Sequence, residues 1–223
     1  MFKYPCIGQF RFLELSIGNH PLYQEISKRM NSGSQRYLDL GCCFAQDLRR
    51  LVFDGAPSEN CYGSDLELEF MEIGYDLFRD RDTLKSKLIS CDVFAPNKKL
   101  DALEGKIDII HAASFFHLFT WDEQVTIGHL VVKLLKQQKN SLIVGRHVGY
   151  VKGRVLPSTS RPNKAIFRHD NDTWKKLWKQ IGDETSTEWE ADSSLEDWRL
   201  RFGKDQTYRE DGAMRMIFSV RRL

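Results

Sequence analysis

The sequence contains no long hydrophobic run and no long block of charge of one sign. A membrane helix needs about 20 consecutive apolar residues, and no stretch approaches that length. The first residues also lack the basic and then apolar pattern of a signal peptide. The 33 Lys and Arg are interleaved with 31 Asp and Glu, so a phosphate-binding surface is not indicated. We therefore expect a cytoplasmic protein that binds neither membranes nor nucleic acid.

Cysteines in metal-binding patterns are also missing. None of the five cysteines forms a Cys-x-x-Cys pair, and the only adjacent pair is Cys42 and Cys43. This spacing argues against both a zinc site and a disulfide framework. We expect no bound metal.

The stretch 36–48 lacks the glycines of a dinucleotide-binding site. An apolar run ends at Asp39-Leu40-Gly41 and changes at once to helical spacing, which is how a doubly wound sheet opens a cofactor crevice. After Gly41, however, the fingerprint positions hold Cys43 and Phe44. The pattern argues against NAD and FAD and favours a cofactor without phosphates. S-adenosylmethionine fits, because it keeps the adenosine and replaces the diphosphate with a methionine.

A second short apolar run ends in an acid, Asp65. It lies roughly 20 residues beyond the turn, where nucleotide-binding folds place the carboxylate that accepts hydrogen bonds from ribose hydroxyls. The alternative is that Gly41 belongs to an ordinary turn and Asp65 caps the helix that follows. The order and spacing of the two features together favour a nucleoside site.

With 223 residues, the chain is long enough for one substantial core, and we interpret it as one domain. Residues 1–35 are an approach segment and partial lid, whose large apolar side chains are expected in the core, with a smaller role in lining an acceptor pocket. Residues 36–223 form the cofactor-binding domain. Its predicted strands are 36–40, 61–65, 87–91, 107–111, 141–145, 187–191 and 213–220, the last two joined by a polar connector. One of its predicted helices ends near 53, and others span 67–78, 120–135 and 171–181; a further helix spans 21–30. Thr120 and Glu123 resemble a capping box at the start of the helix 120–135, and Gly182 is expected to stop the helix 171–181.

Residues 146–168 are expected to be an insertion loop. The segment is basic, is punctuated by Gly149, Gly153 and Pro157, and shows neither a helical nor a strand period. Long loops of this kind often serve as lids or binding loops.

Several short motifs, in this order, resemble those of a family of fungal class I methyltransferases. The family serves secondary-metabolite pathways and includes the carboxyl O-methyltransferases of meroterpenoid biosynthesis. The resemblance covers most of the chain and implies an α/β, Rossmann-like, seven-stranded mixed sheet with helices on both faces and strand order 3-2-1-4-5-7-6. It also implies S-adenosylmethionine as cofactor. The motifs are 39–44, 54–58, 62–66, 78–82, 109–112, 114–119, 144–146 and 168–169.

Two features depart from the family pattern. The second and third glycine positions of the cofactor loop hold Cys43 and Ala45. The family shares the double cysteine but commonly has glycine where Ala45 stands. Members also tend to carry a longer segment before Pro5, so we expect part of a substrate lid to be missing.

The resemblance assigns the cofactor site residue by residue. The carboxylate of Asp92 would meet the adenine amino group, and the N–H of Val93 would face a ring nitrogen. The alternative for Asp92 is a cap on the turn at Pro96. The cofactor-binding residues are expected to be Asp39, Gly41, Cys42, Asp65, Leu66, Asp92, Val93 and Ala112.

The residues that follow strand four are expected to touch the acceptor. Phe115 and Phe116 would line its pocket, and His117 is the best candidate for a base or an orienting group. The alternative for His117 is a packed histidine, which is also the expectation for His111. Arg146 and Arg168 would pair with an acceptor carboxylate, whereas loop arginines usually stay solvated.

The function implied is S-adenosylmethionine-dependent O-methyl transfer to an apolar acid. We expect the reaction to need no metal, and the chain is compatible with a homodimer. Methyl transfer from a sulfonium is a direct displacement, so the protein mainly supplies alignment and water exclusion. Two other classes stay open: a non-methylating cyclase or isomerase with the same fold, and a non-catalytic partner subunit.

Overall fold

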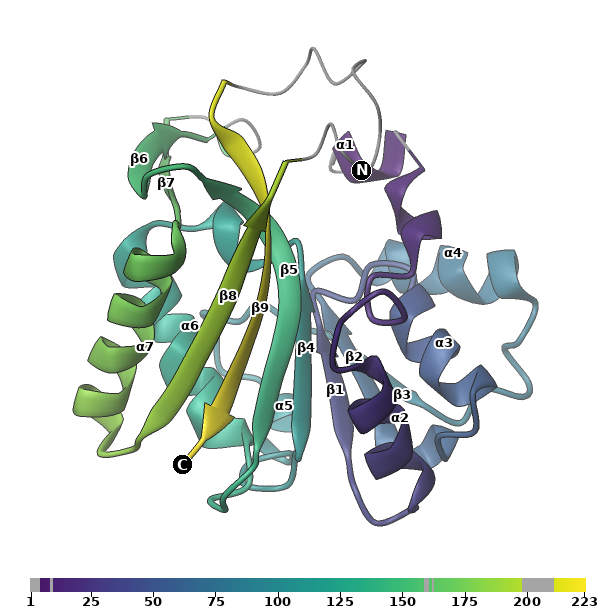
Figure 1. Cartoon of the computed structure of the whole chain (residues 1–223). Coiled ribbons are helices and arrows are strands. Elements are labelled where there is room, and N and C mark those ends of the chain that lie inside the picture. The colour runs from purple at the N-terminus through teal and green to yellow at the C-terminus, as the bar shows by residue number, and fades with distance from the viewer. Residues whose placement is uncertain (1–4, 9, 159–160, 162, 198–210) are drawn as a thin grey trace.

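A computed structural model describes residues 5–8, 10–158, 161, 163–197 and 211–223. A seven-stranded sheet crosses the molecule in the order β3-β2-β1-β4-β5-β9-β8 (Figure 1). The five strands from β3 to β5 are parallel, and β9 and β8 close the sheet as antiparallel neighbours. The bounds are β1 Tyr37–Leu40, β2 Cys61–Asp65, β3 Lys87–Ser90, β4 Ile109–Ala113, β5 Leu142–Tyr150, β8 Trp189–Glu196 and β9 Ala213–Arg222.

The predicted fold class is confirmed. Counted within the main sheet alone, β8 and β9 are the sixth and seventh strands, so the order is 3-2-1-4-5-7-6. Their labels are higher because a separate two-stranded hairpin, β6 (Arg154–Pro157) and β7 (Ala165–Arg168), intervenes. The polar connector expected before the last strand lies largely at 198–210, outside the described residues.

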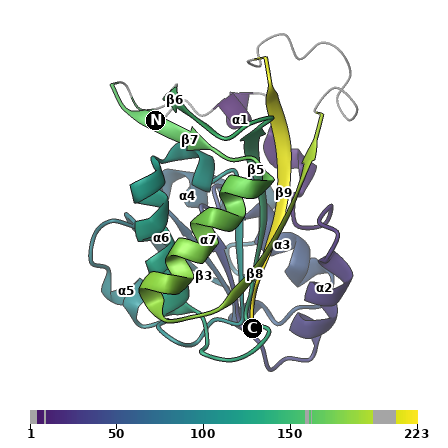
Figure 2. The same ribbon diagram turned by 60° about the vertical axis from the view of Figure 1, so that its left-hand side comes forward.

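Helices cover both faces of the sheet (Figures 1 and 2). On one face, α5, α6 and α7 contribute to a core around Phe116, Trp174 and Trp178. On the other face, α2, α3 and α4 contribute to a second core around Tyr37 and Met30. The central strand β1 is buried along its whole length because one core packs against each of its two faces. The helices are α1 Pro5–Gly8, η1 Arg11–Glu14, α2 Tyr23–Asn31, α3 Gln46–Phe53, η2 Ser58–Asn60, α4 Leu68–Phe78, α5 Lys98–Asp101, η3 Phe116–Leu118, α6 Trp121–Leu134 and α7 Asn171–Thr185.

The expected insertion loop at 146–168 is wrong in its secondary structure. Strand β5 continues to Tyr150 and pairs with β9, and the hairpin β6–β7 follows. Gly149 therefore lies within a strand. A Cβ there would meet the carbonyl oxygen of His169 at 2.8 Å, so the glycine permits close packing and does not mark a loop.

One predicted helix end is confirmed in detail and another is wrong. Thr120 and Glu123 form the reciprocal capping box at the start of α6. Gly182, however, does not end α7, which continues to Thr185 before Ser186 takes a left-handed conformation. A Cβ on Gly182 would meet the carbonyl oxygen of Thr187 at 2.6 Å. This glycine therefore makes room for the returning chain.

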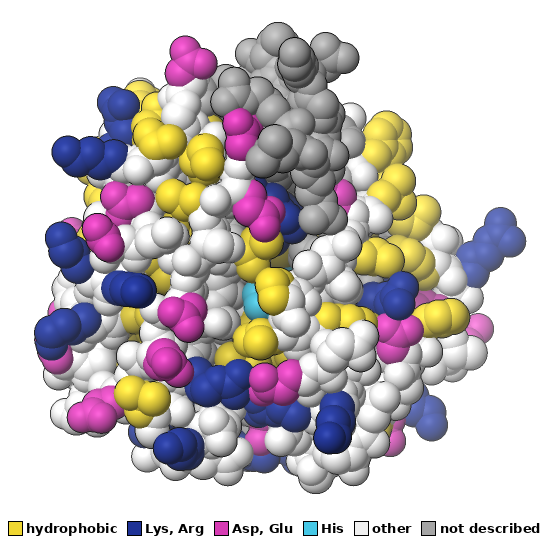
Figure 3. Space-filling view, viewed as in Figure 1, with side chains coloured by type: hydrophobic (Ala, Val, Ile, Leu, Met, Phe, Trp, Pro, Cys, Tyr) yellow, Lys and Arg dark blue, Asp and Glu magenta, His cyan; other side chains and the backbone are white. Residues whose placement is uncertain are grey.

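Charged side chains of both signs are mixed on the face shown in Figure 3. Hydrophobic side chains gather over the N-terminal segment on that face, where Phe10 and Leu13 are 66% and 67% exposed. The expectation that the large apolar residues of this segment lie in the core is therefore wrong for these two. In the part of the chain that the structure describes, no helix combines the length and apolar character needed to cross a membrane.

Gly74 lets helix α4 approach the turn that follows β1. A Cβ at this position would lie 2.5 Å from the carbonyl oxygen of Phe44, which is backbone and cannot rotate away. We expect Gly74→Ala to lower the free energy of unfolding by about 1–3 kcal/mol, even though alanine favours helix by about 1 kcal/mol. Urea unfolding measures the change.

Gly18→Ala is a matched control, because its Cβ would make only ordinary contacts of 3.5 and 3.7 Å. Equal stability of the wild type and Gly74→Ala would contradict the packing argument.

Candidate active site

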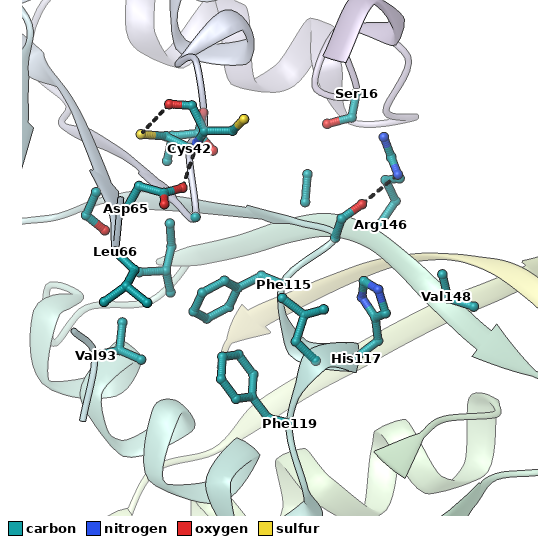
Figure 4. Close-up of a pocket in the computed structure, with 18 of the residues that line it drawn as sticks. Ser16, Cys42, Asp65, Leu66, Val93, Phe115, His117, Phe119, Arg146 and Val148 are labelled. Atoms are coloured by element: carbon teal, nitrogen blue, oxygen red, sulfur yellow. Dashed lines mark hydrogen bonds between the residues drawn. The ribbon is translucent and has the colours of Figure 1, made fainter. Parts of the chain in front are cut away.

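A pocket of about 760 Å³ opens at the carboxyl ends of the parallel strands. Figure 4 shows its two ends: Asp65, Leu66 and Val93 lie at one, and Arg146 and Val148 lie at the other. Phe115 and Phe119 stand between them. Ligands of open α/β sheets bind at this edge, because the turns there carry side chains that the sheet does not bury.

The turn between β1 and α3 forms the floor at the Asp65 end. Gly41, Cys43 and Ala45 all have positive φ, of 75°, 51° and 52°. Two of the glycine positions that the sequence fills with other residues are therefore left-handed all the same. Gly41 is required for a second reason, since a Cβ there would meet the ring of Phe115 at 2.6 Å.

Backbone hydrogen bonds fix this turn to the neighbouring strand. The amides of Gly41 and Cys42 both donate to the carbonyl oxygen of Ser64, at 2.8 and 2.9 Å. The amide of Cys43 donates to Oδ2 of Asp65 at 2.8 Å. The turn and the acid at the end of β2 are thus one hydrogen-bonded unit.

Asp65 lies at the end of β2, as the sequence predicts. It lines the pocket, and it also acts as a cap for the helix that follows, so both of the roles suggested by the sequence have a counterpart in the structure. Its Oδ1 accepts from the amide of Glu67 at 3.1 Å, as a cap near the start of α4 does. Burial raises the pKa of Asp65, while the amides of Glu67 and Cys43 oppose the shift. Each carboxylate oxygen has two lone pairs, so both retain capacity for a ligand hydroxyl.

Asp92 and Val93 line the same end of the pocket as Leu66. Oδ1 of Asp92 accepts from the amide of Phe94 at 2.9 Å, so the carboxylate also shapes its own turn. The helix that follows is capped by Asn97, whose side chain accepts from two amides. Asp92 therefore acts as the turn residue of the alternative reading, and it also lines the pocket.

An aromatic wall separates the two ends. Phe115 and Phe119 contact each other at 5.2 Å between ring centroids, and Phe94 meets Phe119 at 5.5 Å. These three rings line the pocket.

Two residues expected at the site lie outside this pocket. Phe116 is fully buried and packs against Trp174, Trp178 and Phe218, so its expected role in lining the acceptor pocket is wrong. It belongs to the 3₁₀ turn η3, where neighbouring side chains point about 120° apart, so Phe115 and Phe116 cannot share a face. Ala112 is also fully buried and does not line the pocket.

The other end of the pocket holds cations and a histidine: Arg146, Arg168 and His117 all line it. Arg146 belongs to strand β5 and is only 8% exposed, so it is not the solvated loop arginine of the alternative reading. It donates to Oγ of Ser114 at 2.7 Å and lies 3.6 Å from Glu14. Burial lowers the pKa of Arg146, and the charge of Glu14 opposes that shift.

Arg161 is a pocket residue that the sequence did not reveal. Its guanidinium donates to both carboxylate oxygens of Glu123, at 3.0 and 2.7 Å, and to the carbonyl oxygen of Leu118 at 2.6 Å. It also lies over the ring of Phe119, 5.0 Å from the centroid. The capping box predicts the position of Glu123, but no local pattern predicts its partner 38 residues away.

A buried polar chain underlies the Asp39 side of the pocket. Oδ1 of Asp39 lies 2.9 Å from Nδ1 of His111, Nε2 of His111 lies 3.2 Å from Oγ of Ser16, and Ser16 donates to Asp47 at 3.0 Å. Asp39, predicted as a cofactor ligand, does line the pocket. His111 is buried as expected, but it forms hydrogen bonds and is not a purely packing residue.

Asp39, Asp47 and His111 could also approach a metal ion, since their donor atoms lie within 4.8 Å of one another. Hydrogen bonds already occupy one oxygen of Asp39, both oxygens of Asp47 and both ring nitrogens of His111. Metal independence stays a prediction, and activity that survives a chelator would support it.

Searches against known proteins place the fold. No family model matches the chain. The Burkholderia thailandensis 1,6-didemethyltoxoflavin-N1-methyltransferase superposes with a TM-score of 0.60 at 12% identity, covering 88% of this chain and 76% of that one. The [4+2]-cyclase SpnF superposes with a TM-score of 0.61 at 13% identity, covering 88% and 79%. The protein therefore has the class I methyltransferase fold.

Sequence relatives define the family more closely. O-methyltransferase phiE, from the fungal strain ATCC 74256, is 49% identical over 86% of this chain and 64% of its own length. O-methyltransferase atr3 of Stereocaulon alpinum is 39% identical over 100% of this chain and 64% of its own length. The Asnovolin E/Chermesin D methyltransferase nvfJ of Aspergillus novofumigatus is 45% identical over 87% and 71%. The chain belongs to this family of fungal secondary-metabolite O-methyltransferases, although it spans slightly less than two thirds of the length of phiE and atr3.

The Arg161–Glu123 ion pair gives a pH-dependent contribution to stability. The hydrogen bonds from Arg161, more than the opposing effect of burial, lower the pKa of Glu123 to about 2. A lowered folded-state pKa stabilises the protein above the ordinary value of 4.5, and the contribution disappears as the pH falls towards 2. We expect Glu123→Gln to lower the free energy of unfolding by about 1 kcal/mol at pH 7.

In urea unfolding, the difference from wild type should be nearly the same at pH 7 and 5 and clearly smaller at pH 3.5, below the ordinary pKa of 4.5. Glu69→Gln, on the exposed first turn of α4, is the matched control. If the difference in the free energy of unfolding does not change with pH, the stabilisation does not depend on the charge of the Glu123 carboxylate.

Proposed function

We propose that the protein binds S-adenosylmethionine and transfers its methyl group to a carboxylate of a bulky apolar secondary metabolite. One observation carries the proposal: a single pocket joins the acid at the end of β2 to buried and part-buried cations, with an aromatic wall between them (Figure 4). That arrangement suits a nucleoside at one end and an apolar acid at the other.

The cofactor half would be made by the turn after β1 and by the ends of β2 and β3. Asp65 would accept hydrogen bonds from the two ribose hydroxyls, with Leu66 beside the sugar. Asp92 and Val93 would face the adenine. The backbone of Gly41 and Cys42 would pass close to the methionine part, an approach that a side chain on Gly41 would obstruct. The bound cofactor would supply an activated methyl group.

The acceptor half would be made by Phe115, Phe119, Arg146 and Arg168. The rings supply apolar contact area, and an arginine can bind a carboxylate through two parallel hydrogen bonds. The relative nvfJ is named for two substrates, asnovolin E and chermesin D, which supports a metabolite acceptor for this chain as well.

The residues of this chain would act mainly by alignment. A carboxylic acid with a pKa near 4 is ionised at pH 7, so its oxygen needs no base to become a nucleophile. His117 would orient the acceptor, and the aromatic wall would exclude water from the space between the two ends. Alignment of this kind is worth several orders of magnitude in rate.

A non-methylating reaction is the second candidate. The cyclase SpnF shares the fold, so the fold by itself does not fix the reaction. A product whose mass equals that of its substrate, formed without consumption of the cofactor, would favour this reading. Cofactor binding that appears only beside another chain would favour a partner subunit.

Asp65 provides the test of cofactor binding. Charge-assisted hydrogen bonds contribute about 1.5–3 kcal/mol each, so Asp65→Ala should weaken binding of S-adenosylhomocysteine by on the order of 100-fold or more. Calorimetry measures the affinity, and circular dichroism checks that the variant folds. Asp65→Asn keeps the size of the side chain, and Asp82→Asn is a control on an exposed carboxylate. Unchanged affinity in both Asp65 variants would remove the assignment.

His117 distinguishes a carboxylate acceptor from a hydroxyl acceptor. For a carboxylate, His117→Gln should retain much of the activity, and the rate at saturating cofactor should stay nearly flat from about pH 6 to 9. For a phenol, with a pKa near 10, the rate should rise with pH and collapse in the variant. His129→Gln, on the outer face of α6, is the control. An ether product with the second pH profile would contradict the carboxylate reading and leave methyl transfer intact.

A further inference from the structure

The N-terminal segment, residues 11–20, forms one wall of the pocket. Arg11, Phe12, Leu15 and Ser16 line the pocket beside the turn that follows β1. Phe12 meets the ring of Phe44 edge-on at 4.9 Å. The polar attachment of this wall is the buried chain Asp39–His111–Ser16–Asp47.

The hydrogen bonds of Asp47 determine where the hydroxyl hydrogen of Ser16 lies. Oδ1 of Asp47 accepts from the amide of Ile17 at 2.8 Å, and Oδ2 accepts from the side chain of Gln46 at 3.2 Å. Oδ2 also lies 3.0 Å from Oγ of Ser16. Two oxygens at that distance with no hydrogen between them would repel each other, so Ser16 donates its single hydrogen to Asp47.

This leaves Nε2 of His111 as the donor to Ser16. The two atoms are 3.2 Å apart, and the oxygen of Ser16 has no second hydrogen to give. On the other side of the ring, Nδ1 lies 2.9 Å from a carboxylate oxygen of Asp39, which accepts. Both ring nitrogens therefore face acceptors.

We propose that His111 carries a proton on both ring nitrogens and donates one hydrogen bond to Asp39 and one to Ser16. His111 is then a positioning residue, which holds the N-terminal wall against the pocket. A Ser-His-Asp order usually suggests a nucleophilic serine, but here the serine donates its hydrogen to Asp47, away from the histidine. The expected effect on cofactor affinity rests on the proposed function, whereas the protonation of His111 does not.

The surroundings favour the charged ring. Burial alone would lower the pKa of His111, but the charge and hydrogen bond of Asp39, with a smaller effect of Asp47, raise it above the ordinary 6.5. Burial also raises the pKa of Asp39. Other groups of the described residues also face this cluster: the ring of Tyr37, stacked at 6.3 Å, and the charged or titratable groups of Arg146, His20, Asp65, Cys42 and Cys61.

The direction of the pH dependence follows. Both pKa values are raised in the folded protein, so the folded state binds the shared proton more tightly than the unfolded chain does. The attachment of the wall is complete at lower pH and is lost as the pH rises through the raised pKa of His111. A neutral ring has one N–H and cannot donate to Asp39 and Ser16 together.

Nitrogen NMR of the histidine rings tests the protonation directly. At pH 7 the wild type should show His111 with both nitrogens protonated, assigned by the signals that His111→Gln removes. The same titration followed by calorimetry should show the affinity for S-adenosylhomocysteine falling in step with loss of that proton. Ser16→Ala should bind about tenfold more weakly at pH 7 and should lack the step.

Two serine variants separate positioning from a general loss of stability. Ser16→Thr keeps the hydroxyl and should retain the affinity and the step, and Ser34→Ala removes an exposed hydroxyl of the same N-terminal region and should match wild type. A neutral, single-tautomer His111 at pH 7 would overturn the proposal, as would Ser16→Ala with unchanged affinity. If no variant, nor the wild type, binds S-adenosylhomocysteine, the proposed function fails, and the NMR result still decides the protonation.

Discussion

The turn between β1 and α3 determines where everything else at the site must lie. Its first two amides share the carbonyl oxygen of Ser64, and the amide of Cys43 binds Asp65. Left-handed backbone at a non-glycine residue costs about 1–2 kcal/mol, and this turn includes two such residues, Cys43 and Ala45. Three hydrogen bonds to β2 and the burial of Ala45 offset that cost. The turn consequently keeps a glycine-type conformation with only one glycine.

The same constraint explains the aromatic wall. The ring of Phe115 rests on Gly41, so the position of the wall depends on the absence of a side chain in the turn. Phe119 then packs on Phe115 and lies under the guanidinium of Arg161, which Glu123 holds in place. A series of contacts therefore runs from the turn, through the rings, to the hairpin β6–β7. Packed side chains therefore connect the turn to the hairpin along the pocket.

The sequence predicted the end of the pocket that contains Asp65 better than the end that contains Arg146, for a physical reason. The turn, Asp65 and Asp92 belong to strand–turn–helix units, whose spacing is local and repeats through the sheet. The end that contains Arg146 is assembled from the N-terminal segment, η3, β5 and the hairpin, which are far apart in the chain. No periodicity in the sequence reveals that Arg161 meets Glu123 or that Ser16 meets His111. Phe116 was misplaced because a short 3₁₀ turn points neighbouring side chains about 120° apart without any sequence signal.

Asp39 is a motif residue whose carboxylate is already engaged inside the protein. It lines the pocket, and its Oδ1 is already shared with His111. Its Oδ2 is buried without a hydrogen-bond partner in the described parts of the chain. A buried carboxylate in that state is costly unless a positive charge lies close to it. A doubly protonated His111 supplies that charge from inside the protein, so the acid at the end of β1 is stabilised whether or not a ligand is present. The buried ion pair then serves the architecture of the pocket: with both ring nitrogens protonated, Nδ1 donates to Asp39 while Nε2 donates to Ser16 and holds the wall in place.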